Sequence, residues 1–378
     1  MDFQFSEEQL AIRDTVRELV QDKVAPRAAD IDEREEWPED IVKLFVENGV
    51  LAIPIPERYG GISGSSVTIC MATEEIAKAC ASSSLILSVQ ALGSYPILVA
   101  GSEEQRQRLC QPLAEGRIAA YALTEPGSGS DAGAMKTTAR RYGDEYVLNG
   151  SKAFITHGNV ADTMVVFART DGDAGSRGIS AFVLEREQSP WTVVKVEHKL
   201  GIRGSPTALV AFDEVRVPAA NRLGDEGQGF NIALSVLDRS RPGIAAQALG
   251  IAEGALDFAV GYAKERRQFG QPIASFQGLQ FMLADMATQI EAARHLVYLA
   301  ATKVDEQAPD LTKIAAMAKL FASDTAMKVT TDAVQILGGY GYIRDYPVER
   351  MMRDAKITQI YEGTNQIQRV VISRHLLR

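Results

Sequence analysis

A block of strand-like segments between residues 119 and 225, with helical patterns on both sides, is the feature that most limits how this chain can fold. The segments are short, rich in apolar and β-branched residues, and mostly separated by turn-forming residues. Such a block favours a small barrel or sandwich. The expected strands are Ala119 to Thr124, Thr137 to Arg141, Tyr146 to Leu148, Met164 to Ala168, Ile179 to Leu184, Trp191 to Val196 and Ala208 to Val217.

Helical patterns fill the chain before and after this block. Ser6 followed by Gln9 is a capping-box signature, and Ser102 followed by Gln105 repeats it. Long helices joined by short links favour a four-helix bundle after the block. Its expected helices are Gly229 to Arg266 with a kink at Pro242, Phe276 to Val304, and Leu311 to Leu337. We therefore predict an α+β multidomain chain with a helical N-terminal domain (1–118), a β-barrel-like middle domain (119–225) and a C-terminal helical bundle (226–378).

The stretch from Ala79 to Ser102 contains no charged residue, and its length is compatible with a membrane span. Its serines, together with Gln90, Gly93 and Pro96, are poor residues for a lipid environment. We expect instead a helix that is buried on all sides, running without a break from Glu74 through Val89, and no membrane insertion.

The net charge and the cysteine, histidine and N-terminal patterns limit which partners, metals and cellular locations are expected. The net charge is −9 and the pI is about 5.2, which disfavours nucleic acid as a partner. Three widely spaced cysteines without a CxxC pair indicate a reduced, cytoplasmic protein. The four histidines show no metal-ligand spacing, so no metal site is expected. The segment Met1 to Gln4 has neither a basic region nor an apolar run, so no signal peptide is expected.

Glu362 is a candidate general base. It stands between Tyr361 and Gly363, and Thr364 is placed to be the N-cap of a final helix. A glutamate beside an aromatic side chain loses hydration, so its pKa rises and it can accept a proton near neutral pH. The alternative is a solvated glutamate in a loop, with the glycine supplying a turn.

A glycine-rich stretch, Gly127 to Ala132, matches the GxGxxA pattern of dinucleotide-binding turns. That pattern requires a helix next, whereas Thr137 to Arg141 and the following turns predict a strand, so we reject a Rossmann unit. The glycines could let the backbone approach a ligand closely or cradle a phosphate, or they could simply form a β turn.

Two arginine clusters leave two interpretations open. Arg266 and Arg267 end a predicted helix, where the helix dipole favours cations, but they would also suit a pyrophosphate from another molecule. Asp238 and Arg241 could form a charged helix face, or a buried arginine could hold a carboxylate in place.

Three motifs in this order resemble the acyl-CoA dehydrogenase family, and the resemblance extends over essentially the whole chain. They are Tyr121 to Asp131 (YALTEPGSGSD), Gln335 to Gly339 (QILGG), and Tyr361 to Thr364 (YEGT) followed by Gln366 to Arg369 (QIQR). The resemblance implies the helix–β–helix fold, FAD as cofactor, an acyl-CoA thioester as substrate, an electron-transfer flavoprotein as electron acceptor and a homotetramer.

The resemblance also assigns roles to individual residues. Glu362 would be the base, and its own backbone N–H would help to bind the thioester carbonyl. Phe154 stands where the family usually has a tryptophan beside the flavin. Flavin contacts are implied for Tyr121, Leu123, Thr124, Gly129, Ser130, Phe154, Ile155, Thr156, Thr364 and Gln366 and, on the flavin of a neighbouring subunit, Arg266, Gln268, Phe269, Gln277, Gln335, Ile336, Gly338 and Gly339. Substrate contacts are implied for Ser130, Asp238, Arg241, Tyr361 and Gly363.

Two positions indicate the branch of the family. Ser240 occupies the position at which isovaleryl and long-chain members carry their base, and Ser84 occupies that of the arginine of glutaryl-CoA members. Together with Lys199 to Ser205 and Gln247 to Ala252, they resemble short-chain members most, with butyryl-CoA as the expected substrate. The alternatives are a short branched-chain dehydrogenase, an acyl-CoA oxidase-like member, and a flavin-containing DNA-binding relative, against which the net charge of −9 argues.

Overall fold

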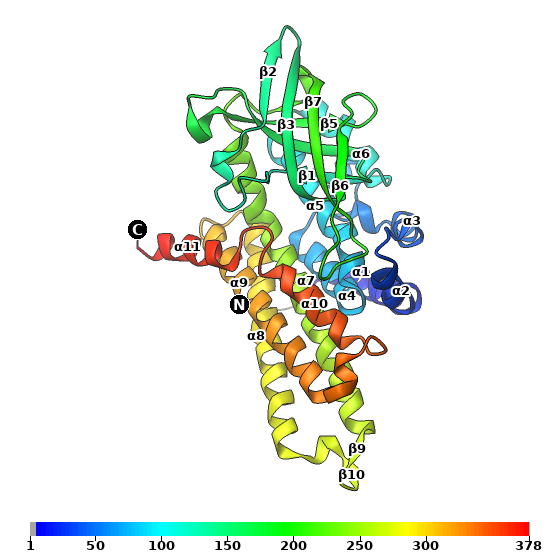
Figure 1. The fold of residues 1–378 in the computed structure, drawn as a ribbon. Helices are drawn as coiled ribbons and strands as arrows, with labels where there is room; N and C mark the ends of the chain where they lie inside the picture. The colour runs from blue at the N-terminus through cyan, green and yellow to red at the C-terminus, as the bar shows by residue number, and fades with distance from the viewer. Residues whose placement is uncertain (1–4, 378) are drawn as a thin grey trace.

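The computed structural model describes residues 5–377, so the segment Met1 to Gln4, where no signal peptide is expected, lies outside it. Helices come first, an eight-stranded sheet follows, and long helices complete the chain (Figure 1). This order confirms the predicted helix–β–helix fold class. The first helices are α1 (Glu7–Leu19), α2 (Ala28–Arg34), α3 (Glu39–Glu47), α4 (Ser66–Ala79), α5 (Ala81–Ala100) and α6 (Glu103–Ala114).

The capping boxes predicted at the starts of α1 and α6 are both present. Ser6 and Ser102 each accept a hydrogen bond from the backbone of the glutamine three residues on, and each glutamine side chain bonds back to the serine N–H. α5 is the charge-free helix, and residues 81–91 are all buried, which is three full turns and therefore every face of the helix. α5 and α7 (Gly229–Glu265) are both long and apolar enough to cross a membrane, with 78% and 67% of their most apolar windows buried inside the protein.

The prediction of one unbroken helix from Glu74 through Val89 was wrong. Cys80 adopts extended backbone angles (φ −150°, ψ 104°), which ends α4 and starts α5 in a new direction. No glycine or proline marks the break, so local propensity could not predict it. α4 instead meets α7 closely on either side of Gly250 and Gly254, where an added Cβ would lie 2.3 Å from backbone oxygens of α4. Packing against α7 therefore fixes where α4 must stop.

The middle of the chain forms one sheet in the order β6-β7-β3-β2-β4-β5-β8, with β1 added in parallel beside β4. A single parallel pair, Thr138 with Arg169, joins its two halves. The strands are β1 (Ala119–Ala122), β2 (Thr138–Tyr142), β3 (Glu145–Thr156), β4 (Thr163–Arg169), β5 (Ile179–Glu185), β6 (Thr192–Val196), β7 (Thr207–Pro218) and β8 (Arg222–Leu223).

One predicted turn in this region was wrong. Asn149 and Gly150 do not end a strand, because both lie inside the twelve-residue β3 at a shift in its register with β7. Asn149 bonds across to Glu214 through both its amide nitrogen and its amide oxygen, and Gly150 has φ +146° against Thr137. The pair forms a β-bulge, which needs the same residue types as a turn.

After the sheet, α7 (Gly229–Glu265), α8 (Gln277–Asp305), α9 (Leu311–Leu337) and the shorter α10 (Val348–Thr358) pack as the predicted bundle. The short strands β9 (Arg267–Gln268) and β10 (Gln271–Pro272) close the far end of the bundle, and α11 (Asn365–Leu376) projects from its side (Figure 1). The segment between α10 and α11 carries Glu362 back to the middle of the molecule.

Two buried apolar clusters hold the chain together. The first joins the opening helices to the sheet, and the second joins α4 and α5 to the bundle. A polar contact links the most distant parts of the sequence, because Arg353 of α10 pairs with Asp32 of α2 at 2.6 Å. The backbone N–H of Ile202, in the loop before β7, donates to buried Asp354 of α10. α10 is thus tied to both other parts of the chain just before the Glu362 segment.

Candidate active site

The Glu362 segment is a strained turn that the surrounding helices hold in place. Glu362 has φ +51° and Gly363 has φ +90°, so two successive residues lie in the left-handed region. For a glutamate this costs on the order of 1 kcal/mol and persists only where the surroundings impose it. Gln368 donates to the carbonyls of both residues, at 3.2 and 2.9 Å, and Lys319 donates to the Gly363 carbonyl at 2.8 Å.

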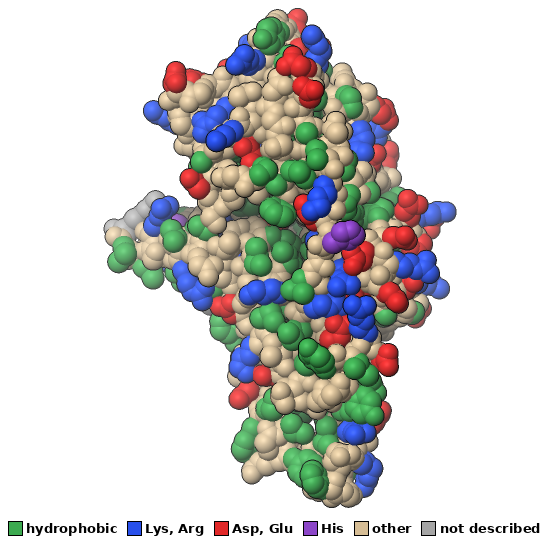
Figure 2. All heavy atoms as spheres, in the orientation of Figure 1, with side chains coloured by type: hydrophobic (Ala, Val, Ile, Leu, Met, Phe, Trp, Pro, Cys, Tyr) green, Lys and Arg blue, Asp and Glu red, His purple; other side chains and the backbone are tan. Residues whose placement is uncertain are grey.

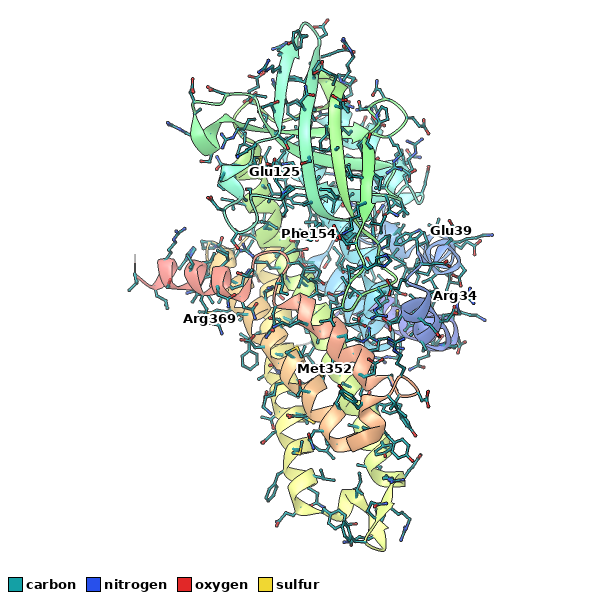
Figure 3. All side chains as sticks on the ribbon, in the orientation of Figure 1. Arg34, Glu39, Glu125, Phe154, Met352 and Arg369 are labelled. Carbon is teal, nitrogen blue, oxygen red and sulfur yellow. The ribbon has the colours of Figure 1, made fainter. Side chains whose placement is uncertain are left out.

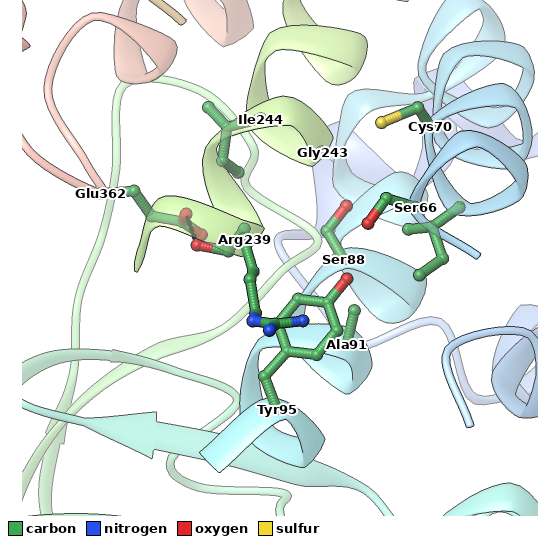
Figure 4. A pocket seen from close by; sticks show the side chains of 11 residues that line it. Ser66, Cys70, Ser88, Ala91, Tyr95, Arg239, Gly243, Ile244 and Glu362 are labelled. Carbon is green, nitrogen blue, oxygen red and sulfur yellow. Dashed lines mark hydrogen bonds between the residues drawn. The ribbon is translucent and has the colours of Figure 1, made fainter. Parts of the chain in front are cut away.

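The carboxylate of Glu362 faces a small cavity between α4, α5 and α7 (Figure 4). Its volume is about 10 Å³, which is room for roughly one water molecule. The hydroxyl of Ser240 donates a short hydrogen bond to the carboxylate. The other lining residues are Ser66, Ile69, Cys70, Ser88, Ala91, Tyr95, Arg239, Gly243 and Ile244.

The charge state of Glu362 is set mainly by burial. Loss of hydration raises the pKa of Glu362 to about 6, while the Ser240 hydroxyl and the nearby cations Arg241 and Lys319 oppose the rise. A carboxylate with this pKa is ionised at neutral pH yet holds a proton far more readily than an exposed glutamate. This favours the buried-base interpretation over the solvated-loop one.

Asp238 and Arg241, predicted as substrate contacts, form an ion pair one turn apart on α7, in which Arg241 is buried and Asp238 is partly exposed. Thr312 donates to the second carboxylate oxygen of Asp238 at 2.6 Å. The Nε–H of Arg241 has no hydrogen-bond partner within the described part of the chain although it is buried. Burial lowers the pKa of Arg241, and Asp238 and Glu362 oppose that change. An unpaired buried donor beside the Glu362 cavity is suited to bind a ligand.

Tyr361 turns its side chain toward the bundle. Its hydroxyl donates to the amide oxygen of Gln247, whose amide nitrogen donates to Ser84 at 3.0 Å. Burial raises the pKa of Tyr361 well above its usual value. Tyr361 therefore anchors the Glu362 segment to α7 and, through Gln247, to α5. The substrate contact predicted for it stays a prediction.

The flavin contacts predicted in and around the sheet lie near the end of strand β3 that meets the helices, a region here termed the sheet edge (Figure 3). Phe154 lies at this edge, 66% exposed and with φ +58° (Figure 3). The hydroxyls of Thr124, Ser130 and Thr156 make no hydrogen bond to other residues of the 5–377 range. A Cβ at Gly129 would meet nothing within 4 Å. The edge therefore offers an aromatic surface, unpaired hydroxyls and open backbone.

Three predicted contacts from the same region are less accessible. The side chains of Leu123 and Ile155 are buried in the core, so only their backbone could touch a ligand. Tyr121 is half-buried, its hydroxyl lies 3.5 Å from the Ala233 carbonyl, and the charge of Glu362 contributes to its raised pKa. Tyr121 therefore links the sheet edge to the Glu362 cavity.

The remaining predicted flavin contacts lie at the far end of the bundle or on α11. Arg266, Gln268, Phe269, Ile336, Gly338 and Gly339 line a cavity of about 550 Å³ there, whereas Gln277 and Gln335 lie next to it in sequence but do not line it. Hydrophobic side chains gather on this end in Figure 2, and Phe269 is 94% exposed. Thr364 is the N-cap predicted for α11, with its hydroxyl accepting from Ile367, and Gln366 is exposed.

The far cavity and the Glu362 segment are well separated within one chain. Gln335 lies sixteen residues beyond Lys319 on α9, and Lys319 contacts the Glu362 segment. At 1.5 Å per residue the separation along the helix is about 24 Å. The far cavity therefore lies apart from the Glu362 cavity within one chain.

Sequence reasoning missed the residues that support the site. Lys319 and Gln368 are fully buried and hold the Glu362 turn, and Lys152 pairs with Glu125 to support the glycine-rich loop. Glu125 in turn accepts from the backbone of Lys136 and Thr137. A single lysine among apolar residues, as in the Ala315 to Ala322 stretch, is the one signal that could have found Lys319.

Models of three acyl-CoA dehydrogenase domains match this chain: the N-terminal domain over residues 6–117, the middle domain over 120–215 and the C-terminal domain over 227–377. The chain belongs to the acyl-CoA dehydrogenase family. These enzymes are FAD-dependent oxidoreductases, and the matches cover nearly all of the chain.

Similar acyl-CoA dehydrogenase family members align end to end with this chain. A short-chain specific acyl-CoA dehydrogenase of Clostridium acetobutylicum is 51% identical, with 100% of each chain covered. Butyryl-CoA dehydrogenase from Megasphaera elsdenii has a structure that superposes with a TM-score of 0.97 at 46% identity, again covering both chains fully. A chain in a structure of the electron transferring flavoprotein of Acidaminococcus fermentans gives 0.98 at 52% identity with the same coverage.

The residues at the sheet edge fit FAD. A flavin ring needs an apolar surface on one face and polar groups at its rim, and the exposed Phe154 and unpaired hydroxyls of Thr124 and Thr156 offer both. An exposed aromatic side chain with strained backbone would otherwise be a net cost to the fold. The family's cofactor is thus compatible with the side chains that this chain presents.

Proposed function

We propose that this protein is a short-chain acyl-CoA dehydrogenase, which converts a saturated acyl-CoA thioester to the trans-2-enoyl-CoA. The observation that carries the proposal is the position and charge state of Glu362. Its carboxylate faces a small cavity, and burial raises its pKa to about 6. Membership of the acyl-CoA dehydrogenase family supports the reaction class.

Glu362 takes the proton from the α carbon of the thioester. The α C–H of a thioester is a weak acid, so the base must be ionised, dry and held within reach of that carbon. The Ser240 hydroxyl, donating to the carboxylate, keeps it ionised and aimed into the cavity. The backbone N–H of Glu362 makes no hydrogen bond within residues 5–377, so it is free to donate to the thioester carbonyl oxygen as negative charge develops there.

Bound FAD would supply the acceptor for the hydride that leaves the β carbon, so that loss of the α proton and of this hydride together forms the double bond. On the protein side, Phe154, Thr124 and Thr156 would hold the flavin ring against the sheet edge. Arg266 and the Gly338–Gly339 turn of a second chain would hold the remainder of the cofactor, which is why we propose a homo-oligomer, with a tetramer as the family pattern. The CoA part would run past Ser130 toward Asp238 and Arg241, whose unpaired Nε–H is a donor for it.

The preferred acyl group is proposed to be short. The cavity beside Glu362 is lined partly by the buried polar side chains of Ser66, Ser88 and Tyr95, which a longer acyl chain would have to displace. The names of the similar proteins, short-chain specific and butyryl-CoA dehydrogenase, point the same way. We propose an electron-transfer flavoprotein as the acceptor, a cytoplasmic location, and neither nucleic-acid binding nor membrane insertion.

Anaerobic bleaching of the bound flavin by a panel of acyl-CoAs tests this proposal. Butyryl-CoA should bleach faster than octanoyl- and palmitoyl-CoA, with a graded preference because each methylene contributes only ~0.8 kcal/mol. Glu362→Gln should stay yellow and bind butyryl-CoA while losing about 10²–10⁴-fold in bleaching rate. Isobutyryl-CoA and glutaryl-CoA test the branched and dicarboxyl alternatives, and rapid reoxidation by oxygen would indicate an oxidase. Bleaching of Glu362→Gln at the wild-type rate would rule Glu362 out as the base.

A further inference from the structure

Lys319 presents a buried ammonium group that the chemistry proposed above does not use. It lies in the first third of α9, has no exposed surface, and donates to the Gly363 carbonyl at 2.8 Å and to Asn365 Oδ1 at 2.9 Å. A buried cation normally takes a carboxylate as its direct partner, because only a full counter-charge offsets the loss of hydration. The hydrogen-bond acceptors of Lys319 are instead neutral oxygens, which belong to residues close to the proposed base.

The carbonyl that Lys319 holds belongs to the strained turn. Glu362 and Gly363 both have positive φ, and such a pair relaxes unless its carbonyls are fixed from outside. Gly363 accepts from Lys319 of α9 and from Gln368 of α11, so the turn is clamped between two helices. Asn365 extends the clamp, because it also bonds Ser323 and Asp324 of α9.

We propose that Lys319 is a positioning residue for the dehydrogenation: its ammonium group, held on Gly363 and Asn365, fixes the left-handed turn that points the Glu362 carboxylate toward Ser240 and the cavity. This proposal rests on the function proposed above, in which Glu362 is the base.

Lys319 affects Glu362 through its charge as well as through the hydrogen bonds that hold the turn. Burial lowers the pKa of Lys319 to about 7, and the Glu362 charge opposes that change while Arg241 adds to it. In turn Lys319 and Arg241 hold down the pKa of Glu362, which burial raises. The other charged group facing the ammonium is Asp324 on its own helix, which Arg369 of α11 pairs at 3.1 Å. Removing the Lys319 charge therefore raises the pKa of Glu362.

Lys319→Met is the decisive variant, because methionine fills the same space without a donor or a charge. Lys328→Met is the matched control: Lys328 lies on the same helix, is half-exposed, and pairs with Asp332 one turn on. Gln368→Met removes the second donor to the same turn without removing a charge. Flavin absorbance and thermal unfolding first establish that each variant is folded and loaded.

Two measurements then separate the roles. Stopped-flow flavin reduction by butyryl-CoA, followed against pH, should show Lys319→Met slower by about 100-fold, as expected for a base displaced by about 1 Å. Its acidic limb should lie at higher pH than in the wild type, and acyl-CoA binding should change little. Hydrogen exchange of the amides in residues 359–364, which needs no substrate, should be faster in Lys319→Met and Gln368→Met. Only Lys319→Met should shift the pH profile, and Lys328→Met should match the wild type throughout.

Wild-type reduction rates, pH profile and amide exchange in Lys319→Met would overturn the proposal. A uniform loss at all pH values, with unchanged exchange of residues 359–364, would also overturn it, because that result describes a packing defect elsewhere. If Lys319→Met does not fold, Gln368→Met decides, and unchanged exchange and rate in that variant refute the clamp. If no acyl-CoA bleaches the wild-type flavin, the proposed function fails, whereas the exchange measurement still judges the role of Lys319.

Discussion

Removing one hydroxyl group should move the pH dependence of this enzyme. In Ser240→Ala, Glu362 loses the hydrogen bond that favours its ionised form. A hydrogen bond to a charged group contributes about 1.5–3 kcal/mol, and 1.36 kcal/mol corresponds to one pKa unit, so the pKa of Glu362 should rise by about 1–2 units. From its starting value of about 6 it would reach about 7–8.

The direction of the change in kcat/KM follows from the fact that only ionised Glu362 can accept the proton. The base is active when ionised, so kcat/KM rises with pH through the pKa of the free enzyme. At pH 6.5 a shift of about 1.5 units leaves roughly one eighth of the wild-type ionised fraction, so kcat/KM should fall about eightfold. At pH 9 both forms are ionised, so Ser240→Ala should lie close to the wild type.

Anaerobic butyryl-CoA oxidation with an artificial dye acceptor, measured from pH 5.5 to 9.5, gives the profile. Ser235→Ala is the matched control, because this half-buried serine lies on the same helix but does not line the cavity. A midpoint that stays in place in Ser240→Ala, or one that moves to lower pH, would refute the assignment of Ser240 as the donor that keeps Glu362 ionised.

Three further outcomes are expected. Glu362→Gln should be more stable than the wild type by up to about 2 kcal/mol at pH 8, because the folded-state pKa of about 6 exceeds the ordinary 4.5 and burying the anion costs stability above it; chemical denaturation should show the gap closing below about pH 4.5. Arg266→Ala should weaken FAD binding by about 1.5–3 kcal/mol in a titration of the apoprotein, and unchanged affinity relative to Lys264→Ala would remove Arg266 from the site. Gly201→Ala should cost about 1–3 kcal/mol of unfolding free energy, because the added Cβ meets the backbone of α10 at 2.5 Å, whereas Gly172→Ala has open space and should be near neutral.

Much of the fold could be predicted because its boundaries are marked locally. The predicted helix from Leu311 to Leu337 matches α9 at both ends, where Gly338 stops it with φ +63°. The caps at Ser6, Ser102 and Thr364 are as predicted, since each depends only on residues three positions apart. The break at Cys80 was missed because packing against α7, far along the chain, decides it.

The candidate site divides in the same way. Glu362 could be proposed from the sequence because its immediate neighbours and the family motif mark it. The Ser240 hydrogen bond spans 122 residues and the Lys319 contact spans 44, and no local pattern predicts which side chains will meet at such separations. The position of Arg266 at a helix end marks it as a possible phosphate contact, but its assignment to the flavin of a second chain rests on the resemblance.

The pair formed by α4 and α5 belongs to both apolar clusters. Ile76 packs into the cluster shared with the sheet, while Met71 and Leu85 pack into the one shared with the bundle. Melting either cluster therefore exposes one face of the same two helices and weakens the other cluster. The molecule should accordingly unfold in one cooperative transition, and a fragment of residues 226–378 on its own would present an uncovered apolar face of α7 and associate with itself.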